Sequence, residues 1–250
     1  MKPHLVQGWL NPNIEDMNKF KEKVQEICEL YTESEKTSKD GIQTYSTDEK
    51  MGIQAREHKN KAIPMSKGHA ERIDPEYERH GTSGIIASRN IATGEIIAAV
   101  QPTRTEEDFA KHIKTVYETA PLCPFVFVTD NLNTHKSESL VLLIAEIEGI
   151  DKETLGKKER HGILKSMASR EAFLSDPLHK IRFVYTPKHC SWLNQIECWF
   201  GIITRRLLNR RASFLSVSDL ENRIVNFINF YNMHMKKPFA WNYTGKLLIV

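Results

Sequence analysis

Three acidic residues of this chain stand where carboxylates could hold divalent metal ions. Asp130 directly follows the apolar run 125–129, Asp48 closes the predicted strand 42–48, and Glu197 lies in segment 191–207, whose apolar residues have helical spacing. Cleavage of a phosphodiester needs a nucleophile at neutral pH and stabilisation of the leaving oxygen, and two divalent ions supply both. Mg²⁺ is usually held by one or two carboxylates, so three acids suffice for a pair.

The acids alone do not establish such a site, because the chain has 32 acidic residues and chance places some in a similar order. Of the three acids, Asp130 is the best supported as a metal ligand, because a charge buried at the end of a strand destabilises the fold unless it has a partner such as a metal. An exposed turn at the strand end is the alternative. Asp48 and Glu49 are adjacent, and because side chains alternate across a strand we expect one of them, Asp48, to face the site.

Three further residues are singled out by their spacing. Asn194 and Gly201 lie one helical turn before and after Glu197, so we expect Asn194 to bond that carboxylate or a substrate, while Gly201 leaves room beside it. His135, five residues after Asp130, is a candidate to approach a phosphate or orient a water. A surface histidine at a helix start is the equally weighted alternative.

Alternation and helical spacing predict the elements that must position these residues. We expect strands at 42–48, 53–57, 84–90, 95–100, 125–129 and 181–185, and helices at 17–31, 105–119, 134–149, 191–207 and from Ser218 onward. Asn13, Thr134 and Ser191 are the expected caps of the first, third and fourth helices, and Gly149 ends the third. Ser218 and Glu221 form a capping box at the start of the last helix. Residues 32–41 form a polar linker, 59–80 an irregular excursion and 151–180 a polar insertion. This order predicts an α/β fold, a mixed sheet covered by helices, with sites at the carboxyl ends of strands. We expect an N-terminal helical arm and linker at 1–40 and one main domain at 41–250.

Composition excludes several classes of protein. With 250 residues, 40% hydrophobic and 27% charged, the chain matches ordinary globular domains. The net charge is only +3, but between residues 181 and 213 six Lys or Arg residues face the single acid Glu197, which indicates either a nucleic-acid surface or a solvated helix face. Four scattered cysteines favour a reducing compartment over a disulfide scaffold, and no segment is apolar enough for a membrane span.

Three motifs carry a resemblance to a known family: STDEKMGIQA at 46–55, VTDNLNTH at 128–135 and YTPKHCSWLNQIECWF at 185–200. Together they resemble a bacterial insertion-sequence transposase of the mariner superfamily, of the insertion-sequence six-thirty type. The resemblance extends from residues 2–10 to residues 241–245, nearly the whole chain.

The resemblance implies a ribonuclease-H-like catalytic core in which Asp48, Asp130 and Glu197 match the DDE triad and hold two Mg²⁺ or Mn²⁺ ions. It also implies cleavage of DNA at transposon ends, strand transfer into target DNA at a TA dinucleotide, a homodimer on DNA, and a bacterial cytoplasmic, nucleoid-associated location. Candidates for contacting DNA or supporting the metal ligands are Asn131, His135, Lys188, Asn194, Arg205 and Arg206.

Two departures from the family pattern leave alternatives open. Members usually begin with helix-turn-helix domains, whereas Met1 falls where the linker to the catalytic core would start. The 66 residues between Asp130 and Glu197 exceed the usual separation because of the insertion at 151–180. A catalytically incomplete DNA-binding remnant and a standalone metal-dependent nuclease therefore remain the alternative functions.

Overall fold

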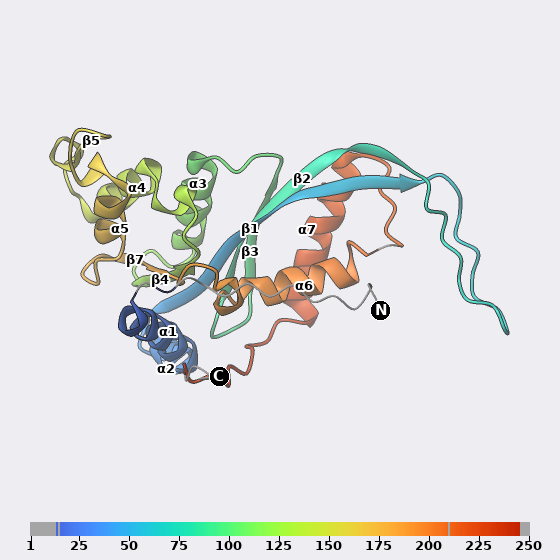
Figure 1. Cartoon of the computed structure of the whole chain (residues 1–250), viewed down its shortest axis with the longest axis horizontal. Helices are drawn as coiled ribbons and strands as arrows, with labels where there is room; N and C mark the ends of the chain where they lie inside the picture. The colour runs from blue at the N-terminus through green and yellow to red at the C-terminus, as the bar shows by residue number, and fades with distance from the viewer. Residues whose placement is uncertain (1–13, 15, 210, 246–250) are drawn as a thin grey trace.

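A five-stranded mixed sheet organises the chain, in the order β3-β2-β1-β4-β7 (Figure 1). The computed structural model describes residue 14, residues 16–209 and residues 211–245. The strands β1 (Gln43–His58), β2 (Tyr77–Asn90) and β3 (Ile96–Gln101) form an antiparallel meander, and β4 (Phe125–Thr129) and β7 (Ile181–Tyr185) extend it in parallel to β1. Together with the flanking helices, this confirms the α/β mixed sheet predicted from the sequence.

Helices cover both faces of the sheet (Figure 1). The helices are α1 (Met17–Thr32), α2 (Ser34–Lys39), α3 (Glu106–Tyr117), α4 (Glu138–Glu148), α5 (Met167–Leu174), α6 (Ile196–Arg206) and α7 (Val217–His234). One core joins α3, α4 and α5 to inward residues such as Phe127 and Phe183. On the other face, α1 packs over Val126 and Val128, while α6 and α7 pack over the meander.

Several predicted boundaries are wrong, because hydrogen bonds made in the folded chain select the caps. The side chain of Ser137, not Thr134, caps α4 after a short 3₁₀ turn (Asn133–Lys136), although the helix ends at the left-handed Gly149 as predicted. Ser216 caps α7, and Glu221 instead accepts a hydrogen bond from Ser83 on β2.

The first helical region also differs in detail from the prediction. Asp16 caps α1, whose buried residues Val24, Ile27 and Tyr31 follow the predicted apolar spacing; Asn13 lies outside the described residues. The segment predicted as a polar linker contains the short helix α2.

A long hairpin extends from the meander (Figure 1). The two strands predicted at 42–48 and 53–57 are one continuous strand, β1. Its pairing with β2 shifts register between Lys50 and Ile53, but the strand does not end there. Beyond β1, residues 59–76 continue as an arm with isolated bridges between Ile63 and Arg72 and between Ser66 and His69.

The insertion at 151–180 folds against the domain as short pieces. Between two 3₁₀ turns (Lys152–Leu155 and Ile163–Lys165) lie the two-residue strands β5 (Gly156–Lys157) and β6 (His161–Gly162), and α5 follows. Leu155, Leu164 and Leu174 are buried in the core shared with α3 and α4. None of the helices in the described residues is long and apolar enough to cross a membrane, and all four cysteines are free thiols.

Candidate active site

The register of two parallel strands brings Asp48 and Asp130 together. The pairs run from Gln43 with Phe125 to Ser46 with Val128, so continuing the register by two residues sets Asp48 beside Asp130. Neighbouring strands lie about 4.8 Å apart. Asp130 ends β4 as predicted, whereas Asp48 lies inside β1, just past its parallel pairing, and not at a strand end.

The two carboxylates have different environments. Asp48 is only 8% exposed, and its burial, reinforced by the neighbouring charge of Asp130, raises its pKa to about 7. The side chain of Asp130 is 37% exposed. Burial acts to raise the pKa of Asp130, but the hydrogen bond and charge of His135 outweigh it and hold that pKa below its ordinary value.

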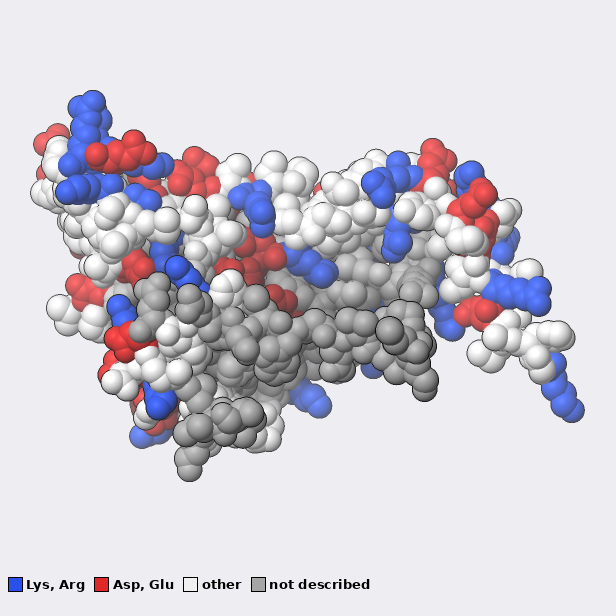
Figure 2. Space-filling model, in the orientation of Figure 1, with Lys and Arg blue, Asp and Glu red and all other residues white. Residues whose placement is uncertain are grey.

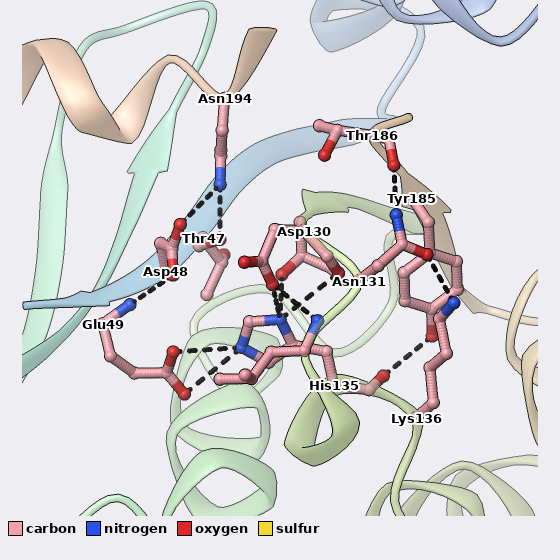
Figure 3. A network of polar contacts seen from close by, with 12 residues as sticks. Thr47, Asp48, Glu49, Asp130, Asn131, His135, Lys136, Tyr185, Thr186 and Asn194 are labelled. Carbon is pink, nitrogen blue, oxygen red and sulfur yellow. Dashed lines mark hydrogen bonds and ion pairs between the residues drawn. The ribbon is translucent and has the colours of Figure 1, made fainter. Parts of the chain in front are cut away.

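Asn194 binds Asp48 and not Glu197. Its side-chain amide donates to Asp48 Oδ2 and to the Thr47 carbonyl, each at 3.1 Å (Figure 3). Ser46 donates to its amide oxygen. The predicted shared helix face is wrong, because Asn194 has extended backbone and precedes the helix. A 3₁₀ turn at Ser191–Leu193 occupies the predicted helix start, so Ser191 is not the cap.

Glu197 lies in the first turn of α6 and is exposed. The backbone next to it is fixed to β1, because the Ile196 N–H donates to Ser46 Oγ at 2.8 Å. The turn before it is fixed to α1, where the Tyr31 hydroxyl donates to the Leu193 carbonyl at 2.8 Å. The start of α6 is therefore hydrogen-bonded to Ser46, two residues before Asp48 on β1, and Glu197 faces solvent.

Glu49 is the residue that sequence reasoning missed. Its carboxylate is buried and lies 3.1 and 3.2 Å from His135 Nε2, while His135 Nδ1 lies 2.7 Å from Asp130 Oδ1 (Figure 3). Alternation predicts that Asp48 and not Glu49 faces the site, and it fixes the Cβ directions, but the longer Glu49 side chain meets the histidine that binds Asp130. Glu49 and His135 are 86 positions apart, so no local spacing signals this contact.

His135 is fully buried, so the alternative of a surface histidine is wrong. Burial acts to lower its pKa, but hydrogen bonds to Asp130 and Glu49 outweigh this and raise the pKa to about 9. The imidazolium is therefore the form between the two carboxylates at neutral pH.

Comparison with known proteins identifies the family. Residues 43–221, more than half of the chain, match the model of the DDE superfamily endonucleases. The chain belongs to this superfamily. No curated protein sequence matches it significantly.

Solved structures show the same fold for this DDE endonuclease. A Mos1 mariner paired-end complex with Mn matches with a TM-score of 0.51 and 12% identity, over 91% of this chain and 61% of that one. The catalytic domain of Mos1 mariner transposase matches with a TM-score of 0.48 and 9% identity, over 93% and 89% of the two chains. The match to the paired-end complex shows that the sheet is ribonuclease-H-like, and this chain spans 61% of that Mos1 chain.

The remaining candidates of the DDE endonuclease fall into two groups. The Asn131 side chain is engaged within the protein, donating to the Thr186 carbonyl and accepting from Lys136. Lys188 is exposed and lines a hollow with Asp130, and Arg205 and Arg206 are exposed in the last turn of α6.

Among the described residues on the face seen in Figure 2, Lys and Arg are interspersed with Asp and Glu and form no continuous patch. Within segment 181–213, Arg182 pairs with Glu26 at 3.2 Å and Arg211 pairs with Glu71 at 2.6 Å. Lys188, Arg205 and Arg206 form no ion pair within the described residues, which leaves them available to phosphates.

The residues fit a hard divalent cation. Asp48 and Asp130 offer oxygen ligands, which Mg²⁺ and Mn²⁺ prefer. Burial, together with the charge of Asp130, raises the pKa of Asp48, and a bound cation would offset both effects. In the described part of the chain, Asp48, Glu49 and His135 offer ligand atoms within 4.8 Å of one another. Glu197 is not part of that group.

Proposed function

We propose that this DDE endonuclease is the catalytic domain of a DNA transposase, which cleaves DNA at transposon ends and transfers the strand with Mg²⁺ or Mn²⁺. The register that sets Asp48 beside Asp130 carries the proposal, because it aligns two carboxylates from separate motifs of the matched family region. The matched Mos1 structure with Mn is a mariner paired-end complex, which supports transposon ends and a metal ion as partners.

In this proposal, Asp48, Asp130 and Glu197 hold two ions. The ions supply an activated nucleophile and neutralise charge on the leaving oxygen. Asn194 keeps one oxygen of Asp48 in place through its amide. The exposed charges of Lys188, Arg205 and Arg206 bind DNA phosphates beside the carboxylates.

A plasmid-nicking assay with Mg²⁺ tests the metal site. We expect Asp130→Ala and Glu197→Ala to lower the rate by about 100-fold or more, since removal of a metal ligand costs several kcal/mol of transition-state stabilisation. Glu57→Ala, on the same strand as Asp48 but near the arm, is the matched control and should nick normally. Equal rates in all proteins would refute the metal-site proposal.

The finer assignments extend this proposal. Motif resemblance supports the insertion-sequence branch of the mariner superfamily, a TA target and a homodimer on DNA. A strand-transfer assay compares TA-containing targets with targets lacking TA. Joining only to the first supports the transposase, whereas cutting without joining favours a standalone nuclease.

A DNA-binding protein without catalysis is the second candidate. The exposed position of Glu197, outside the ligand group of Asp48, favours it. Salt-dependent DNA binding with no metal-dependent cleavage would identify this function, because phosphate contacts alone give a steep salt dependence.

A further inference from the structure

A buried carboxylate lies directly behind the candidate metal ligands. The Glu49 side chain is 1% exposed, and its only described side-chain partner is His135 Nε2, at 3.1 and 3.2 Å from the two carboxylate oxygens. Burying a carboxylate is costly unless it is paired. Neither side chain is exposed to solvent, so the contact with His135 is what offsets the cost of burying Glu49.

Both nitrogens of His135 are occupied within the protein. Nδ1 lies 2.7 Å from Asp130 Oδ1 and 2.8 Å from the Thr129 hydroxyl, and Nε2 faces Glu49. The ring packs against Phe109 with centroids 4.2 Å apart, and the Tyr185 hydroxyl donates to the His135 carbonyl. A ring held on all sides cannot turn to bind an ion or a phosphate.

The two oxygens of Asp130 are used differently. Oδ1 accepts from the Leu132 N–H at 2.9 Å and from His135 Nδ1. Within the described part of the chain, Oδ2 has no hydrogen bond. The contacts to Oδ1 stop the carboxylate from rotating. Because the side chain is partly exposed, Oδ2 remains available to a ligand.

We propose that Glu49 and His135 are positioning residues, which act through Asp130 by holding its Oδ1, so that Oδ2 would be left free for a metal ion. The inference rests on the proposed function, because it assumes that Asp130 binds metal. Partners behind a ligand typically change metal affinity or activity about 10- to 100-fold, since they fix its orientation. Glu49 fixes the ring, and the ring fixes the carboxylate.

The alternative is that Glu49 binds the ion directly, since it belongs to the group with ligand atoms within 4.8 Å. The two roles differ in how mutations combine. If Glu49 acts through His135, the losses from Glu49→Gln and His135→Asn are not additive in the double variant, because both break one chain of contacts. If Glu49 is itself a ligand, its loss weakens binding further, so the double variant binds Mn²⁺ more weakly than His135→Asn alone, toward the sum of the two losses.

The test measures Mn²⁺ binding by electron paramagnetic resonance of the free ion, without DNA. All proteins carry Glu57→Gln, because Glu57, Glu78 and His80 form a second cluster that could take up Mn²⁺. The Glu57→Gln protein is the reference, and Asp130→Asn, Glu49→Gln, His135→Asn and the double variant are compared with it. Thermal melting of each protein identifies variants that have lost the fold, and the isosteric Glu49→Gln guards against that loss.

We expect Glu49→Gln to weaken Mn²⁺ binding about 10- to 100-fold in a protein that is still folded at the assay temperature. If Glu49→Gln binds Mn²⁺ as tightly as the reference protein while Asp130→Asn has lost binding, the positioning role is wrong but the metal site is supported. Additive losses overturn it in favour of direct ligation. Reference affinity in Asp130→Asn overturns both the metal site and the inference that rests on it.

Discussion

Lys136 and Glu171 form an ion pair of 2.8 Å that attaches the loop after β4 to the insertion helix α5. The ammonium is nearly buried, lies over the Tyr185 ring and also donates to Asn131. Beside it, the Arg170 guanidinium donates to the Lys136 carbonyl at 2.6 Å. The insertion therefore supports the segment that carries Asp130.

Removal of Glu171 should destabilise the protein, because it leaves a buried ammonium with fewer partners. We expect Glu171→Gln to lower the free energy of unfolding by about 2 kcal/mol in urea denaturation. The exposed pair Lys114–Glu146 provides the control, and Glu146→Gln should cost less than about 1 kcal/mol. Equal losses in the two variants would contradict the structural importance of the buried pair.

Asn194 should matter for activity more than for stability alone. We expect Asn194→Ala to lower Mg²⁺-dependent nicking about 10-fold or more, since Asp48 loses the amide that orients it. Asn232, which bridges the backbone of Ile96 away from the site, is the matched asparagine. Asn232→Ala should destabilise the fold while the rate per folded molecule stays normal; a similar rate loss in both would refute the specific role.

Arg89 holds the segment after α7. Its guanidinium donates to the Lys237 carbonyl at 2.7 Å and to the Tyr231 hydroxyl at 3.0 Å, and it stacks 3.6 Å from the Phe239 ring centroid. We expect Arg89→Lys to expose residues 236–245 to hydrogen exchange, because an ammonium cannot reproduce the planar contacts.

Gly94 gives an independent test of the same contact. It has φ +77°, and an added Cβ would lie 2.2 Å from the Lys237 carbonyl oxygen. Gly94→Ala should therefore expose the same residues, while Gly149→Ala, where the added Cβ meets open space, should leave their exchange unchanged. Unchanged exchange in Arg89→Lys would contradict this attachment.

His112 should make stability depend on pH. Burial lowers its pKa from 6.5 to about 4, so the unfolded chain binds a proton at higher pH than the folded protein does. Stability is complete above pH 6.5 and falls as the pH drops toward 4. Between pH 7.5 and 5.0 the wild type should lose about 2 kcal/mol more than His112→Gln in urea denaturation. Equal losses in the two proteins would show that His112 does not contribute.

The exposed cations near α6 should contribute to DNA affinity. We expect Lys188→Ala, and Arg205→Ala with Arg206→Ala, to weaken binding and to reduce the slope of log K against log salt by about one for each lost phosphate contact. Lys152→Ala, exposed on the insertion, is the control for loss of a single positive charge. The same slope in all variants would exclude these residues from the DNA surface.

The sequence was sufficient for elements defined by local patterns. The apolar runs of β4 and β7 and the glycine end of α4 are confirmed because burial and backbone conformation act within a few residues there. Helix starts were less predictable, because more than one serine near α7 could serve as its N-cap. The hydrogen bond from Ser83 to Glu221 takes Glu221 out of the predicted capping box, and Ser216 caps the helix instead.

The site itself was only partly predictable. Motifs singled out Asp48 and Asp130, and the parallel register, which ends two residues before each of them, is consistent with their lying side by side. The roles of Asn194 and Glu49 depend on partners 146 and 86 positions away, which no local spacing reveals. Periodicity instead suggested that Asn194 shares a helix face with Glu197, although the chain there leaves the helix to reach β1.

The distance in sequence between Asp48 and Asn194 has a consequence for biosynthesis. A nascent chain that has emerged only as far as β4 contains both aspartates, but the amide that orients the first is not yet made, and β7 has not covered the other side of β4. Contacts of this span form late, because closing long loops is slow. If the proposed metal site needs this amide, a chain truncated before Asn194 should hold both aspartates and still cut no DNA.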